Sequence, residues 1–179
     1  MCHPKADEKQ RLEFQIALTK YKEEGIPVAY LDESGFANDT PRTHGYAYIG
    51  ERCYGKYDWH ARGRTNVIGA ITSNQFITTC LFDTNINSDI FYAWINDDLL
   101  PKLSEKTVIV MDNATFHKRS DMVEAIKKAG HILEYMPPYS PDLNPIEHKW
   151  HEAKAKKREK QCSVMNLFKD YFMYHSILP

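Results

Sequence analysis

Three acidic residues stand where the carboxylates of an active site are often found. Asp32 and Asp112 each close a short apolar run, and Glu147 opens a helical stretch directly after the segment PPYSPDLNP. Carboxylates from separate segments can hold two divalent cations roughly 3.5–4 Å apart, which together activate a nucleophile and stabilise a leaving oxygen. The pattern therefore indicates metal-dependent chemistry on a phosphodiester.

The acids also have simpler explanations. The chain contains 24 Asp and Glu residues, so an isolated acid carries little weight. Asn144 could cap the last helix with Pro145 at its first position, and Glu147 would then stand three residues after the cap, as in a capping box. Clustered carboxylates, in contrast, repel one another unless a cation lies between them, so a true cluster would be poorly explained as scaffold.

The apolar patterns place these acids on an α/β framework. We predict strands at residues 28–32, 67–72, 75–82, 107–111 and 131–136, and helices at residues 8–24, 89–100, 118–129 and from about 145. A hairpin next to strands joined by helices implies a mixed sheet with helices on both faces. Asp32 and Asp112, at strand ends, could then converge with Glu147 at one edge of the sheet.

Length and composition narrow the class of protein. A chain of 179 residues favours one domain, and 42% hydrophobic residues are enough for a core. No apolar run approaches the roughly 20 residues of a membrane span, and the polar N-terminus lacks a signal-peptide core, so we expect a cytoplasmic protein. The cysteines, Cys2, Cys53, Cys80 and Cys162, form no CxxC pair and are expected to be free thiols.

The net charge of −1 argues mildly against a nucleic-acid partner unless the basic residues cluster, and two stretches do concentrate them. Within residues 37–66, basic residues alternate with Tyr and Trp, which suits a nucleic-acid surface or, equally, a hairpin with Tyr in its core. The run KAKKREK after Glu147 suits either a solvated face or phosphate contact. The candidate DNA contacts are Arg42, Arg52, Arg62, Arg64, Lys154, Lys157 and Arg158.

Three motifs together resemble a known family. The stretches YLDESGF, VIVMDNATFH and YMPPYSPDLNPIEHKW resemble the catalytic motifs of the mariner-type DDE transposase superfamily, in particular its bacterial insertion-sequence branch. Thirty-four residues separate Asp112 from Glu147, as in the superfamily members that end in Glu. The resemblance covers roughly residues 8–158, and its last motif is highly specific.

The resemblance implies a ribonuclease-H-like fold in which Asp32, Asp112 and Glu147 bind two Mg²⁺ or Mn²⁺ ions. It further implies DNA cleavage at transposon ends, strand transfer into target DNA, and a homodimer acting on paired ends. Asn113 and His117 belong to the second motif, where His117 either approaches the triad or the scissile phosphate, or simply orients the loop after Asp112.

The same resemblance guides the domain prediction. Family members usually carry one or two helix-turn-helix units before the catalytic domain, and the residues before Asp32 are expected to be too few for one. We predict an N-terminal linker helix (residues 1–26), a catalytic domain (residues 27–160) and a C-terminal tail or helix (residues 161–179). End recognition would then come from a separately encoded helix-turn-helix partner, and the chain would associate with the nucleoid when bound to DNA.

Two other functions remain open from the sequence. The chain could be a non-catalytic remnant or DNA-bound regulator that dimerises with an intact transposase, or a nuclease with the same fold. Glu33, next to Asp32, is expected to be an exposed or hairpin-pairing acid.

Overall fold

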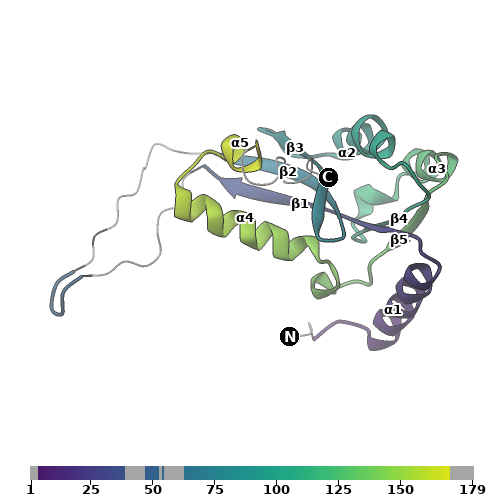
Figure 1. Cartoon of the computed structure of the whole chain (residues 1–179), viewed down its shortest axis with the longest axis horizontal. Helices are drawn as coiled ribbons and strands as arrows, with labels where there is room; N and C mark the ends of the chain where they lie inside the picture. Colours follow the sequence, from purple (N-terminus) through teal and green to yellow (C-terminus); the bar gives the residue numbers. More distant parts are fainter. Residues whose placement is uncertain (1–3, 39–46, 53, 55–62, 170–179) are drawn as a thin grey trace.

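The fold centres on a five-stranded mixed sheet. The computed structural model describes residues 4–38, 47–52, 54 and 63–169. The strands are β1 (Val28–Ala37), β2 (Arg64–Thr72), β3 (Gln75–Phe82), β4 (Val108–Met111) and β5 (Ile132–Tyr135). They lie in the order β3-β2-β1-β4-β5, with β1, β2 and β3 antiparallel, β4 parallel to β1 and β5 parallel to β4 (Figure 1). The predicted α/β class and mixed sheet are confirmed.

Helices cover both faces of this sheet. In the described part of the chain they are α1 (Glu8–Glu23), α2 (Ser88–Trp94), α3 (Ser120–Lys128), α4 (Ile146–Lys160) and α5 (Val164–Leu167). Figure 1 shows α2 and α3 on one side of the strands and α1 and α4 on the other. Within the described residues, no helix is both long enough and apolar enough to cross a membrane.

Alternate positions of the strands contribute to separate cores on the two faces of the sheet. One core joins Ala29, Leu31, Ile68, Ala70, Ile109 and Met111 of the strands to Phe91, Trp94, Ile95, Leu99, Met122 and Ile126 of the helical segments. On the opposite face, Phe36, Val67, Ile71 and Phe76 pack against Trp150 and Ala153 of α4. Because successive side chains of a strand point to opposite faces, Asp32 of β1 lies on the α4 face and Glu33 on the α2–α3 face.

Both terminal segments pack on this framework where they are described. Phe14 and Leu18 of α1, predicted as part of a linker, are buried against Val108 and Val110 of β4. The tail contributes buried Val164, Leu167 and Phe168 to the core around Trp150. Residues 170–179 lie outside the described part of the chain.

The predicted β2–β3 hairpin is confirmed, and its turn has a clear local cause. Ser73 and Asn74 adopt positive φ angles of 46° and 66°. Two central residues in the left-handed region make the type I′ turn, whose twist matches that of the two strands.

The predicted end of β1 at Asp32 is wrong. β1 continues to Ala37 because β2 pairs with it along its whole length, with Asp32 opposite Gly69. Ser34 and Gly35, residue types that are common in turns, lie inside the strand opposite Val67 and Asn66. The guanidinium of the exposed Arg64 lies over Gly35, 1.5 Å from where a Cβ would stand, so a larger residue there would displace the Arg64 side chain.

Two predicted helices differ in their details. The helix predicted at residues 89–100 starts at Ser88 with Asn87 as its cap, changes to π-helix at Ile95–Leu99 and ends in the 3₁₀ turn Leu100–Lys102. The helix predicted at residues 118–129 begins only at Ser120. A separate 3₁₀ turn, Thr115–Lys118, precedes it and carries His117.

Candidate active site

The three predicted acids line one cavity of about 350 Å³. It lies where β4 ends, bounded by the proline-rich segment that leads from β5 into α4. Its lining comprises Asp32, Asp112, Asn113, Ala114, Glu147, Asn144 and the segment 136–141. The structure therefore brings together acids that are 115 residues apart along the chain, from Asp32 to Glu147.

Asp32 is held from the α4 side. Its Oδ2 accepts a hydrogen bond of 3.0 Å from the indole Nε1 of Trp150. The opposite residue, Gly69, leaves room for this indole, since a Cβ there would lie 2.6 Å from a Trp150 ring carbon. Burial raises the pKa of Asp32, the charges of Glu147 and Glu33 raise it further, and the result is about 7. A cation in the cavity would offset the repulsion among these carboxylates and lower the pKa of Asp32.

We therefore expect Asp32→Asn to stabilise the metal-free protein at alkaline pH. In the folded protein the pKa of Asp32 is raised to about 7. Below the pKa of the unfolded chain, Asp32 is neutral in both states and costs no stability. As the pH rises from there through about 7, stability is lost because the unfolded chain ionises more readily than the folded one. The free energy of unfolding in EDTA at pH 8 should rise by on the order of 1–3 kcal/mol. At pH 4 the difference should disappear. Urea denaturation measures both, with exposed Asp83→Asn as control; an unchanged or lower stability at pH 8 would contradict the expectation.

Asp112 is held by two donors on the same oxygen. Its Oδ1 accepts from the backbone N–H of Ala114 at 2.9 Å and lies 2.6 Å from Nδ1 of His117. Burial raises the pKa of Asp112, but these two hydrogen bonds and the charge of His117 outweigh it and keep the pKa below its ordinary value. No described residue donates to Oδ2 of Asp112.

His117 bridges two carboxylates beneath the cavity. Its side chain is 2% exposed, and its Nε2 lies 2.9 Å from Oε1 of Glu33. The ring packs on Phe91 with centroids 4.2 Å apart, and Tyr135 donates to the His117 carbonyl. Burial lowers the pKa of His117, but the two carboxylates raise it to about 9. At neutral pH the imidazolium therefore donates to both acids.

Glu33 is the residue that sequence reasoning missed. It was expected to be exposed or to pair within a hairpin, yet its side chain is only 20% exposed and lies against His117. The available signal was the strand period. Glu33 points to the face opposite Asp32, where the turn carrying His117 packs.

Glu33→Gln should lower the pKa of His117 from about 9 toward its ordinary 6.5, because one of its two carboxylate partners loses its charge. An NMR titration of the ring protons in the metal-free protein measures this shift, and we expect a fall of roughly one unit or more. Glu105→Gln, at an exposed site, is the matched control. A titration identical to that of the unaltered protein would show that Glu33 does not contribute to the charge of His117.

Glu147 lies in the first turn of α4 with an exposed side chain, between buried Ile146 and buried Trp150. The capping-box alternative is wrong. The backbone N–H of Asn144, which the Glu147 carboxylate would have to satisfy, donates instead to the carbonyl of Pro141 at 3.0 Å. The helix starts one residue later than predicted, after Pro145, and has no side-chain cap.

The donor set suits a hard divalent cation. Mg²⁺ and Mn²⁺ prefer oxygen ligands, and Mg²⁺ keeps several waters, so a few carboxylates suffice. Within the described residues, no group of three His, Cys, Asp or Glu side chains is already arranged around one ion. Glu147 is exposed and lines the cavity with Asp32 and Asp112. The residues therefore fit a hard divalent cation by the chemistry of their donor atoms.

The predicted DNA contacts separate into two groups. Arg52 and Arg64 are exposed, and Lys154 and Arg158 of α4 are half-buried. Lys157 is 3% exposed and donates to the backbone carbonyl of Asn38 at 3.0 Å. Its ammonium is thus withdrawn from the surface and is not placed to contact a DNA phosphate. Arg42 and Arg62 lie outside the described residues.

Comparison with known proteins places this geometry in a family. The model of the family described as DDE superfamily endonuclease matches residues 27–165. The crystal structure of the mariner Mos1 paired end complex with Mg matches with a TM-score of 0.74 and 18% identity, over 97% of this chain and 57% of that one. The corresponding complex with Mn matches with a TM-score of 0.64 and 16% identity, over 88% and 52%.

The crystal structure of the catalytic domain of Mos1 mariner transposase matches with a TM-score of 0.63 and 14% identity, over 96% of this chain and 83% of that one. No curated protein sequence matches the chain. The present chain spans just over half of the transposases in the paired end complexes.

These likenesses confirm the ribonuclease-H-like fold implied by the three motifs. The family model covers well over half of the chain, including all three acids of the cavity. The chain therefore belongs to the DDE superfamily of endonucleases.

Proposed function

We propose that this chain is the catalytic domain of a transposase, which cleaves DNA at transposon ends and transfers the 3′-hydroxyl into target DNA. The observation that carries the proposal is the cavity in which Asp32, Asp112 and Glu147 meet on a DDE endonuclease fold. The similar structures include complexes with paired transposon ends, which supports DNA as the partner.

Asp32, Asp112 and Glu147 would bind the two Mg²⁺ or Mn²⁺ ions. When bound, divalent cations polarise the phosphate, activate the nucleophile and stabilise the leaving oxygen. One oxygen of Asp32 is already held by Trp150, and one oxygen of Asp112 by His117 and Ala114. The remaining oxygen of each carboxylate is thereby oriented for a cation, as outer donors orient ligands in other metal sites.

His117 and Asn113 would support this site in different ways. His117, buried beneath the cavity, fixes Asp112 rather than touching the substrate. Asn113 is exposed in the cavity lining, where its amide could donate to a phosphate oxygen. Glu33 joins this supporting group through His117.

The DNA would lie over the cavity and contact basic side chains elsewhere on the surface. Arg52, Arg64, Lys154 and Arg158 remain the proposed phosphate contacts, since their side chains reach the surface. We further propose a homodimer on paired ends, a separately encoded helix-turn-helix partner, and an origin in a bacterial insertion sequence. Association with the nucleoid follows from binding to DNA.

The proposal is tested by incubating the chain and its DNA-binding partner with labelled transposon ends and either Mg²⁺ or Mn²⁺. We expect metal-dependent nicking at the ends and joined products with target DNA. The same reaction on an RNA–DNA hybrid separates the nuclease alternative. If the chain cleaves the hybrid and leaves the transposon ends uncut, its substrate is not transposon DNA. If it cleaves neither substrate, the proposal of an active enzyme is contradicted.

A further inference from the structure

Few backbone hydrogen bonds hold the segment that leads into α4. Between Tyr139 and Glu147, the backbone forms a single 3₁₀ turn, Pro141–Leu143, closed by bonds from Leu143 to Ser140 and from Asn144 to Pro141. The start of α4 has no side-chain cap, and no described residue donates to the Glu147 carboxylate. The position of Glu147 therefore depends on what holds this turn.

Helix α1 holds the turn by a forked ion pair. The guanidinium of Arg11 donates to both carboxylate oxygens of Asp142, at 3.0 and 2.7 Å. The Arg11 side chain is 10% exposed and that of Asp142 is 41% exposed, so the pair stands at the protein surface with its Arg11 side shielded. The Arg11 hydrogen bonds and charge hold the pKa of Asp142 below its usual value. Two parallel N–H···O bonds fix both distance and orientation, which a single point charge does not.

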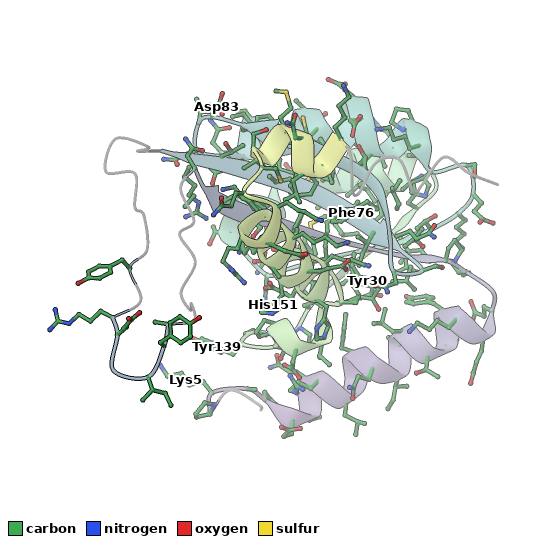
Figure 2. All side chains as sticks on the ribbon, turned by 60° about the vertical axis from the view of Figure 1, so that its left-hand side comes forward. Lys5, Tyr30, Phe76, Asp83, Tyr139 and His151 are labelled. Carbon is green, nitrogen blue, oxygen red and sulfur yellow. The ribbon has the colours of Figure 1, made fainter. Side chains whose placement is uncertain are left out.

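Two further contacts seat α1 beside the same turn. Lys5, just before the helix, places its ammonium 5.9 Å from the centre of the Tyr139 ring, and Figure 2 shows these side chains together. Phe14 and Leu18 pack in one cluster with Met136, which directly precedes the proline-rich segment, and with Leu143 inside it. The other end of α1 is fixed elsewhere, because Tyr21 donates to Glu134 of β5 at 2.8 Å.

We propose that α1 belongs to the catalytic unit and that Arg11 is a positioning residue for Glu147. Through Asp142, Arg11 fixes the turn from which α4 starts, and so fixes where the Glu147 carboxylate stands at the rim of the cavity. The α1 helix lies outside the residues that match the family model, which begin at residue 27. The inference rests on the proposed function, since it takes Glu147 as a ligand of the bound cation.

Manganese binding to the whole chain tests the inference by isothermal titration calorimetry. Arg11→Met keeps the aliphatic part of the side chain and removes the guanidinium that donates to Asp142. Asp142→Asn removes the negative charge of the carboxylate that accepts these bonds. Each should weaken Mn²⁺ binding about 3- to 10-fold, somewhat less than loss of a direct outer-shell partner. The exchanged pair, Arg11→Asp with Asp142→Arg, should restore binding to within about 2-fold. Circular dichroism and thermal unfolding give the folded fraction of each variant.

Two controls separate positioning from stability. Tyr21→Phe removes a second polar contact of α1, the hydrogen bond to Glu134, and should lower the thermal stability without changing Mn²⁺ affinity. Lys9→Met removes a charge from the exposed side of the same helix and should change neither. If Arg11→Met does not fold, Asp142→Asn still tests the positioning role. The Asp142 side chain is 41% exposed, so this substitution should not prevent folding.

The possible outcomes are distinct. If Asp112→Asn abolishes Mn²⁺ binding while Arg11→Met and Asp142→Asn bind as the unaltered chain does, the positioning role is overturned and the proposed function stands. If Asp112→Asn binds Mn²⁺ normally, the proposed triad fails, and this inference fails with it. Weakened binding in both single variants with rescue in the exchanged pair supports the inference.

Discussion

Asp112→Asn will abolish DNA cleavage while leaving the fold intact. The amide keeps the size of the side chain and an oxygen that can accept from the Ala114 N–H, so packing around β4 should not change. It loses the negative charge that binds the cation, and we expect activity on transposon ends to fall on the order of 1,000-fold or more. Gel analysis of end cleavage in Mg²⁺ and in Mn²⁺ measures the loss.

Asp97→Asn is the matched control for this variant, since Asp97 is exposed on the helical segment between β3 and β4, away from the cavity. It should cleave as the unaltered chain does. Cleavage by Asp112→Asn at the normal rate would remove Asp112 from the triad and leave the cavity without its central ligand.

Trp150→Ala should cause the largest loss of stability of any single substitution in α4. The indole is 1% exposed and packs among Phe36, Phe76 and Phe168, with ring centroids 5.4–6.2 Å apart. Removing a buried aromatic ring leaves a large void, which costs about 3–5 kcal/mol in the free energy of unfolding. Chemical denaturation with circular dichroism as the signal measures this cost.

Trp150→Phe separates packing from the hydrogen bond to Asp32. It keeps a ring in the aromatic cluster, so the loss of stability should be smaller, about 1–2 kcal/mol. It also removes the indole N–H that holds Oδ2 of Asp32, and end cleavage should fall even where the protein is fully folded. Full activity in Trp150→Phe would show that Asp32 needs no such donor.

The sequence predicted the elements whose cause is local or periodic. The hairpin of residues 67–82, with its turn at Ser73-Asn74, and the apolar strands each depend on a few neighbouring residues. The meeting of Asp32 and Asp112 was predicted from strand ends, but only Asp112 follows the end of its strand. Asp32 lies beside it because β1 pairs in parallel with β4 over Val28–Tyr30, and both acids follow that paired stretch. Glu147 joined them through its place at the start of a helix that must pack back on that sheet.

The errors arose where tertiary contacts decide between local alternatives. Ser34-Gly35 reads as a turn, but pairing with β2 keeps it in a strand. The link from Glu33 to His117 joins residues 84 apart in sequence, which no local pattern can show. Lys157 did have a signal, because it follows the buried Trp150 and Ala153 at helical spacing and so continues the inner face of α4.

The register between β1 and β2 does not depend on the length of the chain that connects them. Nine residue pairs, from Ala29–Thr72 to Ala37–Arg64, fix the ladder, and a backbone bond from Asn38 to Gly63 closes it. The entropy cost of closing a chain segment grows only slowly with its length. We therefore expect Asp32 to stay opposite Gly69 when residues are inserted between Asn38 and Gly63.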